Sequence, residues 1–284
     1  GLGGLLFGVG MTMAGGCANK NLVRVGGGSV RSLVVLVFMG IASYMTLKGL
    51  FGQWRATWLD PVAIRLDAAG WPDQSLGTAL SRLAGLDART AQLVVMAVVV
   101  LALLAFAFKD KRFRGNTQQI VGGVVLGLLV AAGWYVTGHL GYGENPETLE
   151  TVFQGTNSRT LESMSFVGPT AYGLELLMLW TDQSLHATFG IASVLGVLLG
   201  SAVVAVATGS FRWEGFSSVA DLRSQLLGAV LMGFGGVTAL GCTIGQGMSG
   251  LSTLALGSAL ALAGIVTGSV AMLKYTIWQA ERED

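Results

Sequence analysis

Charge is scarce in this sequence. Only 12% of its 284 residues are charged, whereas 52% are hydrophobic. Soluble domains carry about 25% charged residues, so the composition excludes an ordinary soluble domain and predicts an integral membrane protein. The formal net charge is only +1, which excludes the strongly basic surface that nucleic-acid binding requires.

Cysteine and histidine are scarce as well, with two of each. Two cysteines cannot build a disulfide framework of the secreted kind, and no CxxC or Cys/His cluster predicts a metal site. The sequence shows no Ser/His/Asp pattern and no phosphate-binding loop. We therefore predict no catalytic residues, no metal and no cofactor. His139 and His186 lie near the ends of apolar runs, where we expect them at the level of the lipid headgroups.

Glycine, in contrast, is abundant. The chain has 43 glycines, about twice the usual share of roughly 7%, and they cluster within apolar stretches. Glycine there lets membrane helices approach closely or break. The chain opens at Gly1 directly in such a stretch, and we expect that the natural protein has further membrane segments before it.

Five apolar runs are long enough to cross a bilayer, since a spanning helix needs about 20 residues. They cover residues 30–51, 90–108, 118–140, 184–209 and 254–278. The stretch 170–180 is too short to span and predicts an interfacial or re-entrant helix. Segment 52–89 contains Trp54, Trp58 and Trp71, and tryptophan is enriched at membrane interfaces, so we expect part of it in the outer interface.

The distribution of charge predicts the orientation. The loop KDKRFR, residues 109–114, carries four basic residues, and the positive-inside rule places it in the cytoplasm. Alternation of the spans then places the loop 141–168 outside, segment 52–89 outside, and two pairs of arginines inside. The outer loop carries the acids Glu144, Glu147, Glu150 and Glu162, and the inner arginines are Arg24, Arg31, Arg212 and Arg223.

An internal repeat is the most informative feature. The stretch GGLLFGVGMTMAGGC, residues 3–17, aligns without a gap with GAVLMGFGGVTALGC, residues 228–242, at a constant offset of 225. Both cysteines fall at the same position, directly after Gly16 and Gly241. We infer a duplication and predict one transmembrane domain over residues 1–284, built from two repeats with signature segments at about 3–33 and 228–258.

Each copy has an apolar run of only about 12 to 14 residues. At 1.5 Å per residue such a helix does not cross a core of about 30 Å, so we expect it to end at its Gly–Cys turn near the midplane. Irregular backbone at that depth must be buried or line a polar cavity. Short, glycine-interrupted segments in both halves of a transporter indicate its substrate site. We favour an inverted arrangement of the repeats, which leaves the C-terminal end inside; a parallel arrangement is the alternative.

Polar groups follow each cysteine, and polar residues at membrane depth usually face a pathway. Glycine-rich turns and restarting helices present backbone N–H groups that bind anions. A thiol adds a weak donor and a soft, polarizable atom, which favours a small sulfur-containing anion. The predicted substrate site comprises Gly16, Cys17, Asn19, Lys20, Gly241, Cys242, Thr243, Gly245 and Gln246.

Simpler interpretations of the two cysteines, Lys20 and Gln246 stay open. A free cysteine is often only a small buried hydrophobic residue. Lys20 can extend its ammonium group to an interface, and Gln246 can simply tie helices together.

The two signature segments carry a family resemblance. GGLLFGVGMTMAGGCANKNLVRVGGGSVRSL and GAVLMGFGGVTALGCTIGQGMSGLSTLALGS resemble those of the YeeE/YedE family of bacterial inner-membrane proteins. The resemblance implies an hourglass-shaped, all-α polytopic bundle whose short broken helices meet at a central constriction. It also implies passage of thiosulfate along cysteine side chains by transient S–H hydrogen bonds, with Cys17 and Cys242 as the signature cysteines. Thiosulfate-uptake members carry a further cysteine in the N-terminal part, and nothing here matches it; it belongs to the expected missing segment, or the substrate differs.

The predicted function is therefore a permease, and not an enzyme, that takes thiosulfate or a related small sulfur anion into the cytoplasm. The expected partners are that anion, the lipid bilayer and a small cytoplasmic sulfur-carrier or sulfurtransferase protein. Three alternatives remain: a membrane-embedded thiol carrier that forms a cysteine persulfide, a transporter of selenium compounds, and a structural membrane subunit without transport.

Overall fold

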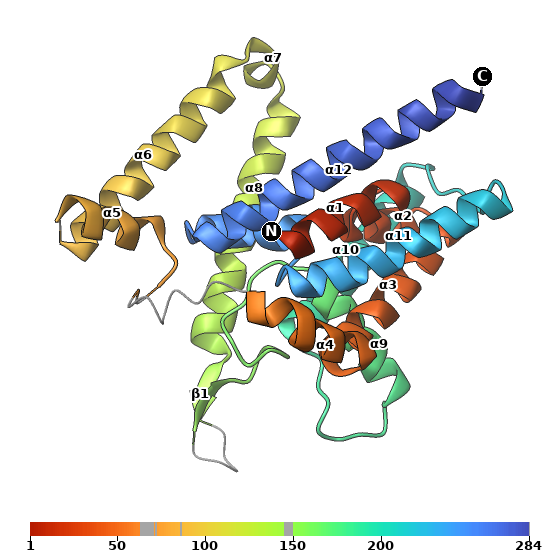
Figure 1. The fold of residues 1–284 in the computed structure, drawn as a ribbon, viewed down its shortest axis with the longest axis horizontal. Helices are drawn as coiled ribbons and strands as arrows, with labels where there is room; N and C mark the ends of the chain where they lie inside the picture. Colours follow the sequence, from red (N-terminus) through yellow and green to blue (C-terminus); the bar gives the residue numbers. More distant parts are fainter. Residues whose placement is uncertain (63–70, 72, 86, 145–149, 284) are drawn as a thin grey trace.

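A computed structural model gives the fold (Figure 1) and describes residues 1–62, 71, 73–85, 87–144 and 150–283. Within these residues the regular structure is helical, apart from one antiparallel hairpin of β1, Tyr142–Glu144, and β2, Thr151–Phe153. The α-helices are α1 Leu2–Met13, α2 Ala18–Gly26, α3 Val30–Lys48, α4 Leu50–Trp54, α5 Leu76–Ala84, α6 Ala88–Lys109, α7 Lys111–Arg114, α8 Thr117–Tyr135, α9 Val167–Met178, α10 Phe189–Ala207, α11 Val219–Thr238 and α12 Leu256–Glu283. Three π-helices, η1 Arg55–Leu59, η3 Val136–Leu140 and η4 Gly245–Gly250, and the 3₁₀ turn η2 Asp60–Val62 complete the described elements.

Six described segments are long and apolar enough to cross a membrane. Five of them match the predicted runs, and the all-α, multi-pass architecture is thereby confirmed. The sixth, Leu2–Gly26, contains α1, the first Gly–Cys turn and α2. The other five are Val30–Lys48, Ala88–Lys109, Thr117–Leu140, Phe189–Ala207 and Leu256–Arg282.

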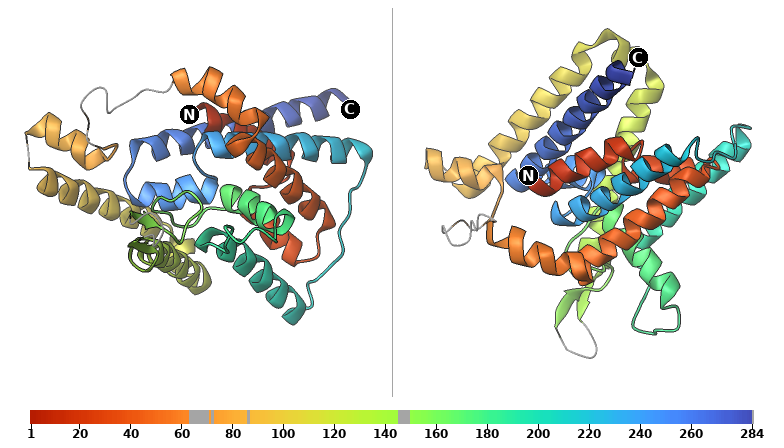
Figure 2. Two further views of the ribbon diagram at one scale, coloured as in Figure 1. Left: turned by 90° about the horizontal axis from the view of Figure 1, so that it is seen from below. Right: turned by 45° about the vertical axis from the view of Figure 1, so that its right-hand side comes forward.

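Four helices form the centre of the molecule. Helix α1 packs against α12 on one side and α11 on the other, and α11 in turn packs against α3. Figures 1 and 2 show the red N-terminal helix between the blue C-terminal helix and the lighter blue α11. The row α12–α1–α11–α3 thus joins the two signature segments directly.

Glycines set the close approach of α1 and α11, and their contacts are reciprocal. A Cβ added at Gly3 would lie 2.6 Å from the amide nitrogen of Ala239, and a Cβ at Gly228 would lie 2.7 Å from the amide nitrogen of Ala14. At the repeat offset of 225, Gly3 corresponds to Gly228 and Ala239 corresponds to Ala14, so the two contacts are equivalent. Gly10 and Gly235 are equivalent in the same way. A Cβ added at either residue would lie 2.5 to 2.7 Å from backbone atoms of the other helix. Only glycine permits this spacing of the two backbones.

The prediction for the second copy needs a correction. Helix α11 has 20 residues, not 12 to 14, because it begins with a polar turn that hydropathy alone does not assign to a membrane helix. Ser218 caps this start, since its hydroxyl oxygen accepts a hydrogen bond from the amide of Asp221 at 3.1 Å. Length alone therefore does not require α11 to end at the midplane.

The remaining elements surround the central row. Helices α6 and α8 extend away from it and are joined at α7 (Figure 1). Helix α9 has 12 residues, too few to span, and packs on α3 and α10. Within segment 52–89, Trp54 and Trp58 are exposed, while residues 63–70, 72 and 86 lie outside the described residues, as does Glu147 of the predicted outer loop.

Candidate functional site

The first turn lies between α1 and α2. Gly15 has a left-handed φ of +73°, a conformation that glycine adopts without steric cost. The amide of Gly16 donates to the carbonyl oxygen of Met11 at 2.9 Å and closes the end of α1. Cys17 then begins α2 as its N-cap residue, with extended backbone angles and a half-buried side chain.

The second turn, after α11, has the same backbone hydrogen bonds. Gly241 donates to Gly236 at 2.8 Å, the counterpart of the bond from Gly16 to Met11 at the offset of 225. The left-handed position, however, is occupied by Leu240, with a φ of +59°, and not by glycine. Glycine therefore occupies the left-handed position in the first turn, and leucine occupies it in the second.

One position later, directly before each cysteine, a glycine leaves room for a side chain that packs against the turn. A Cβ at Gly16 would lie 2.6 Å from Cδ of Lys20, and a Cβ at Gly241 would lie 3.2 Å from the side-chain nitrogen Nε2 of Gln246. Each glycine therefore leaves space for a polar residue of the following helix.

Amide side chains hold both turns. Asn21 donates from Nδ2 to the carbonyl oxygens of Gly16 at 2.9 Å and Cys17 at 3.2 Å. Gln246 donates from Nε2 to the carbonyl oxygen of Ala239 at 2.7 Å. Asn21 and Gln246 each stand four residues after a cysteine. Arg24 adds a third contact in the first turn, from Nη1 to the carbonyl oxygen of Gly15 at 3.0 Å.

The two turns meet in space. The hydroxyl of Thr243, directly after the second cysteine, donates to Sδ of Met11 in the first copy at 3.6 Å. Cys17 packs against the buried cluster that contains Cys242. Cys242 is 1% exposed, and its sulfur accepts a hydrogen bond from the amide of Gly245 at 3.4 Å.

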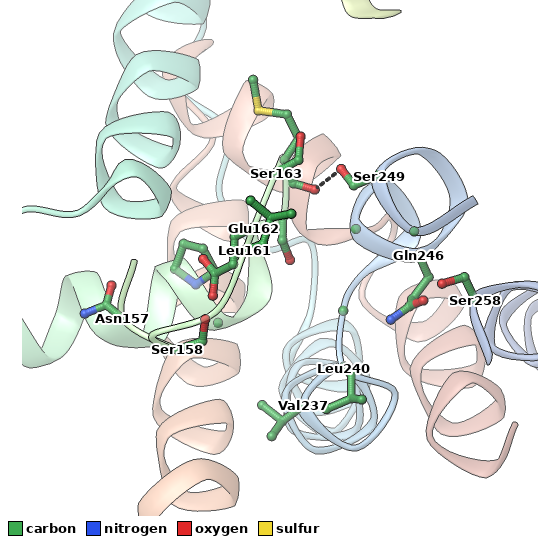
Figure 3. Close-up of a pocket in the computed structure, with 18 of the residues that line it drawn as sticks. Asn157, Ser158, Leu161, Glu162, Ser163, Val237, Leu240, Gln246, Ser249 and Ser258 are labelled. Atoms are coloured by element: carbon green, nitrogen blue, oxygen red, sulfur yellow. Dashed lines mark hydrogen bonds between the residues drawn. The ribbon is translucent and has the colours of Figure 1, made fainter. Parts of the chain in front are cut away.

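A pocket of about 300 Å³ leads to the second turn. One wall is the segment 157–165 with the start of α9, and the other is the second turn with η4 (Figure 3). Ser249 of η4 joins the walls, because its hydroxyl donates to the carbonyl oxygen of Met164 at 2.8 Å. The polar lining residues are Asn157, Ser158, Glu162, Ser163, Ser165, Tyr172, Gln246, Ser249 and Ser258, together with the indole of Trp134.

The predicted site residues divide into two groups. Gly241, Gly245 and Gln246 line the pocket, and Cys242 lies beside Gly245, whose Cβ would be 3.8 Å from its sulfur. The members from the first copy do not line this pocket: Gly16 and Cys17 form their own turn, Asn19 is half-buried, and Lys20 is exposed with its alkyl chain over Gly16.

Two sets of residues were not among the predicted site residues. The first is Asn21 and Arg24, which hold the first turn; applying the repeat offset to Gln246 identifies Asn21. The second is Glu162, Ser163 and Tyr172 in the pocket wall, which no motif or periodicity marks. In the described part of the chain, no group of three or more His, Cys, Asp or Glu side chains could hold a metal ion.

Comparison with known proteins extends over almost the entire chain. A family model described as sulphur transport matches residues 2–271. The chain is 27% identical over 274 residues to the thiosulfate transporter TsuA of Spirochaeta thermophila, covering 95% of this chain and 75% of the relative. It is 26% identical over 253 residues to the thiosulfate transporter TsuA of Escherichia coli, covering 87% of this chain and 65% of that relative.

Proposed function

Since this chain belongs to the sulphur transport family, we propose that it is a permease that takes thiosulfate or a related small sulfur-containing anion into the cytoplasm. The two relatives named as thiosulfate transporters support this substrate. The resemblance based on the signature segments is confirmed, and the family indicates transport rather than an enzymatic reaction. The protein is a multi-pass membrane protein, which agrees with the bacterial inner membrane.

The meeting of the two Gly–Cys turns is the observation that carries this proposal. Thr243 of one turn contacts Met11 beside the other, and both cysteines pack in the same cluster. Sulfur is soft and polarizable, so two thiols at one narrow point favour the terminal sulfur of thiosulfate over a hard oxyanion. We assign the constriction of the anion path to Cys17 and Cys242.

In this proposal, the anion reaches the constriction through the pocket. Its hydroxyl and amide groups offer hydrogen bonds to an anion, and Gly241, Gly245 and Gln246 connect it to the second turn. Cys242 is 1% exposed and its sulfur contacts the amide of Gly245, so in this proposal the anion reaches the thiol when the turn around Gly245 moves. Asn19 and Lys20 follow Cys17 on the cytoplasmic side of the proposed path, whereas Thr243 lies beside the constriction, where it contacts Met11.

We also propose that the domain consists of two repeats in inverted orientation. The reciprocal contacts support this arrangement, since Gly3 meets Ala239 as Gly228 meets Ala14. An antiparallel helix pair whose equivalent residues exchange contacts has an approximate two-fold axis between the helices. Inverted repeats of this kind surround midplane substrate sites in transporters.

Uptake of labelled thiosulfate into proteoliposomes tests the function. Cys17→Ala and Cys242→Ala should each reduce the initial rate at least tenfold without loss of folding, because the change in volume is small. Ser43→Ala is the matched control: it truncates a buried side chain of α3 whose hydroxyl bonds only to the carbonyl of Met39. Wild-type uptake by the double cysteine variant would contradict the assignment of the thiols.

Competition defines the substrate class. Sulfate matches thiosulfate in charge and shape but lacks the soft terminal sulfur, so excess sulfate should inhibit only weakly. Selenite tests the selenium alternative. If the wild type takes up no thiosulfate but takes up another of these anions with saturable kinetics, that other anion is the substrate.

A covalent sulfur carrier is the second candidate, and one observation favours it. Cys17 is only half-buried, at the N-terminus of α2, whereas Cys242 is 1% exposed, so Cys17 is the thiol that a sulfur donor can reach. Such a carrier would deliver sulfur to a cytoplasmic carrier or sulfurtransferase protein. Mass spectrometry after exposure to thiosulfate distinguishes the two: a persulfide or S-sulfonate on Cys17 supports the carrier, and unmodified thiols during continued uptake support the permease.

A further inference from the structure

Glu162 occupies an unusual position for a transporter of anions. It lies in the wall of the pocket that leads to the second Gly–Cys turn, beside Ser158 and opposite Gln246 (Figure 3). Among the described lining residues it is the only carboxylate, and none of them is Lys, Arg or His. An ionised Glu162 therefore places a negative charge in the proposed path of a divalent anion, with no lining cation to neutralise it.

The segment that carries Glu162 is firmly held. The hydroxyl of Thr137 donates to the backbone carbonyl of Glu162 at 2.5 Å, and the hydroxyl of Ser163 donates to the carbonyl of Val130 at 2.9 Å. These bonds join the segment to α8 and to the π-helix η3 that follows it, so the segment is not a free loop.

The surroundings of the carboxyl group favour its protonated form. Burial raises the pKa of Glu162, and hydrogen bonds from the hydroxyl and backbone N–H of Ser158 lower it by less. In the sequence, segment 154–166 lies between the candidate spans Thr117–Leu140 and Phe189–Ala207. It belongs to the loop that we predict to face outward.

The other ionisable groups near Glu162 do not neutralise it. Tyr172 of α9 lines the same pocket and is uncharged at neutral pH. Lys48 at the end of α3 lies 5.9 Å from the centroid of the Tyr172 ring, but its ammonium group pairs with Glu175 at 2.8 Å. Arg159 and His139, in the adjoining loop and π-helix, are exposed and do not line the pocket.

We propose that Glu162 is a proton-binding site of the entrance pocket, so that a divalent sulfur anion binds there only together with one proton. The proton comes from the outer solution and forms the O–H bond of the carboxyl group. The neutral carboxyl no longer repels the anion and donates a hydrogen bond to it. When the anion leaves, the carboxyl returns its proton to water. This inference rests on the proposed function and adds the proton as a second ligand of the same pocket.

The pH dependence of the KM for thiosulfate tests the site. Thiosulfate stays a dianion from pH 5 to pH 8.5, so any change reports on the protein. Above the pKa of Glu162 the wild-type KM should rise by about tenfold per pH unit, since one proton must bind with each anion. Glu162→Gln mimics the neutral carboxyl and should show a low KM that is independent of pH. Glu162→Asp retains an acid and should retain a pH-dependent KM.

Glu150→Gln is the matched control, because Glu150 is an exposed acid of the same outer region and does not line the pocket. It should keep the wild-type profile. An unchanged pH profile in Glu162→Gln would overturn the inference while leaving thiosulfate transport intact. A folded Glu162→Gln protein without uptake at any pH would overturn it as well. Failure of the wild type to transport thiosulfate at every pH would instead overturn the proposed function.

A direct measurement supplements the kinetics. Addition of thiosulfate to the weakly buffered wild-type protein in detergent should remove protons from solution, as a pH-sensitive dye reports. Glu162→Gln should bind thiosulfate without this proton uptake. Equal proton uptake by both proteins would contradict the assignment to Glu162.

Discussion

The side-chain amide of Gln246 donates a hydrogen bond to the carbonyl oxygen of Ala239 at 2.7 Å, across the turn that contains Cys242. Asn21 donates in the same way to the turn that contains Cys17, and 225 residues separate the two amides. Side-chain donors thus satisfy carbonyl groups at both turns: that of Ala239 at the end of α11, and those of Gly16 and Cys17 within the first turn. Water is not available for this purpose in the hydrocarbon core of a bilayer.

Replacement of Gln246 should damage both stability and transport. Gln246→Met keeps a similar volume but leaves the carbonyl of Ala239 without its donor, which costs about 1–3 kcal/mol for a buried group. The thiosulfate uptake rate should fall with it, because the position of Cys242 depends on this turn. Thermal unfolding in detergent and proteoliposome uptake measure the two effects.

Gln225→Met provides the comparison on α11. The Gln225 amide donates to Asp221 at 2.6 Å, near the start of the helix and far along it from the turn. Its replacement should lower stability while uptake per folded protein stays near wild type. Equal uptake by the two variants would contradict a positioning role for Gln246.

The glycine contacts between α1 and α11 predict a second effect. Gly235→Ala should destabilise the protein by about 1–3 kcal/mol or more, since its Cβ would lie 2.5 Å from the amide nitrogen of Phe7 and rigid backbone has to move. Gly10→Ala should have a similar cost, because Gly10 makes the reciprocal contact with the backbone of α11.

Gly127→Ala on α8 is the control, because nothing lies within 4 Å of its added Cβ. It should leave the unfolding temperature unchanged or raise it slightly, since alanine is the better helix former. Equal unfolding temperatures for Gly235→Ala and Gly127→Ala would show that the close contact of α1 with α11 is absent in the membrane protein.

Particular residues show what the sequence could predict. Hydropathy located the spans because every residue of a lipid-facing helix contributes to the same average, but it missed the first turns of α11, where Asp221 and Arg223 interrupt the apolar pattern. The repeat offset of 225 relates Cys17 to Cys242, and it also relates Asn21 to Gln246. Nothing local indicated Glu162, because its position in the pocket arises from tertiary contacts of its segment with η3 and η4.

The two cysteines should differ in their reactivity toward thiol reagents. Cys17 is half-buried, whereas Cys242 is 1% exposed, so a small membrane-permeant maleimide should label Cys17 first. Mass spectrometry over time measures both rates in one sample. Cys17→Ala should retain only the slow phase, and Cys242→Ala only the fast one. Faster labelling of Cys242 would mean that the second turn opens readily without substrate.

Glu162 should also leave a signature in folding stability that does not depend on transport. Burial raises its pKa in the folded protein above the ordinary glutamate value of about 4.3, so the folded chain holds this proton more tightly than the unfolded chain. The resulting stabilisation is fully present below the ordinary pKa and is lost as the pH rises through the raised one. The unfolding temperature of the wild type should fall across this window.

Glu162→Gln removes the titrating group and should remove this decrease, so its unfolding temperature should vary less with pH than that of the wild type. Glu150→Gln should behave as the wild type, because Glu150 is exposed. Unfolding in detergent over a pH series, with all three proteins in the same buffers, gives the comparison. If wild type and Glu162→Gln lose stability in parallel, Glu162 is already ionised in the folded protein at low pH, and its carboxylate is then stabilised by water that reaches the pocket.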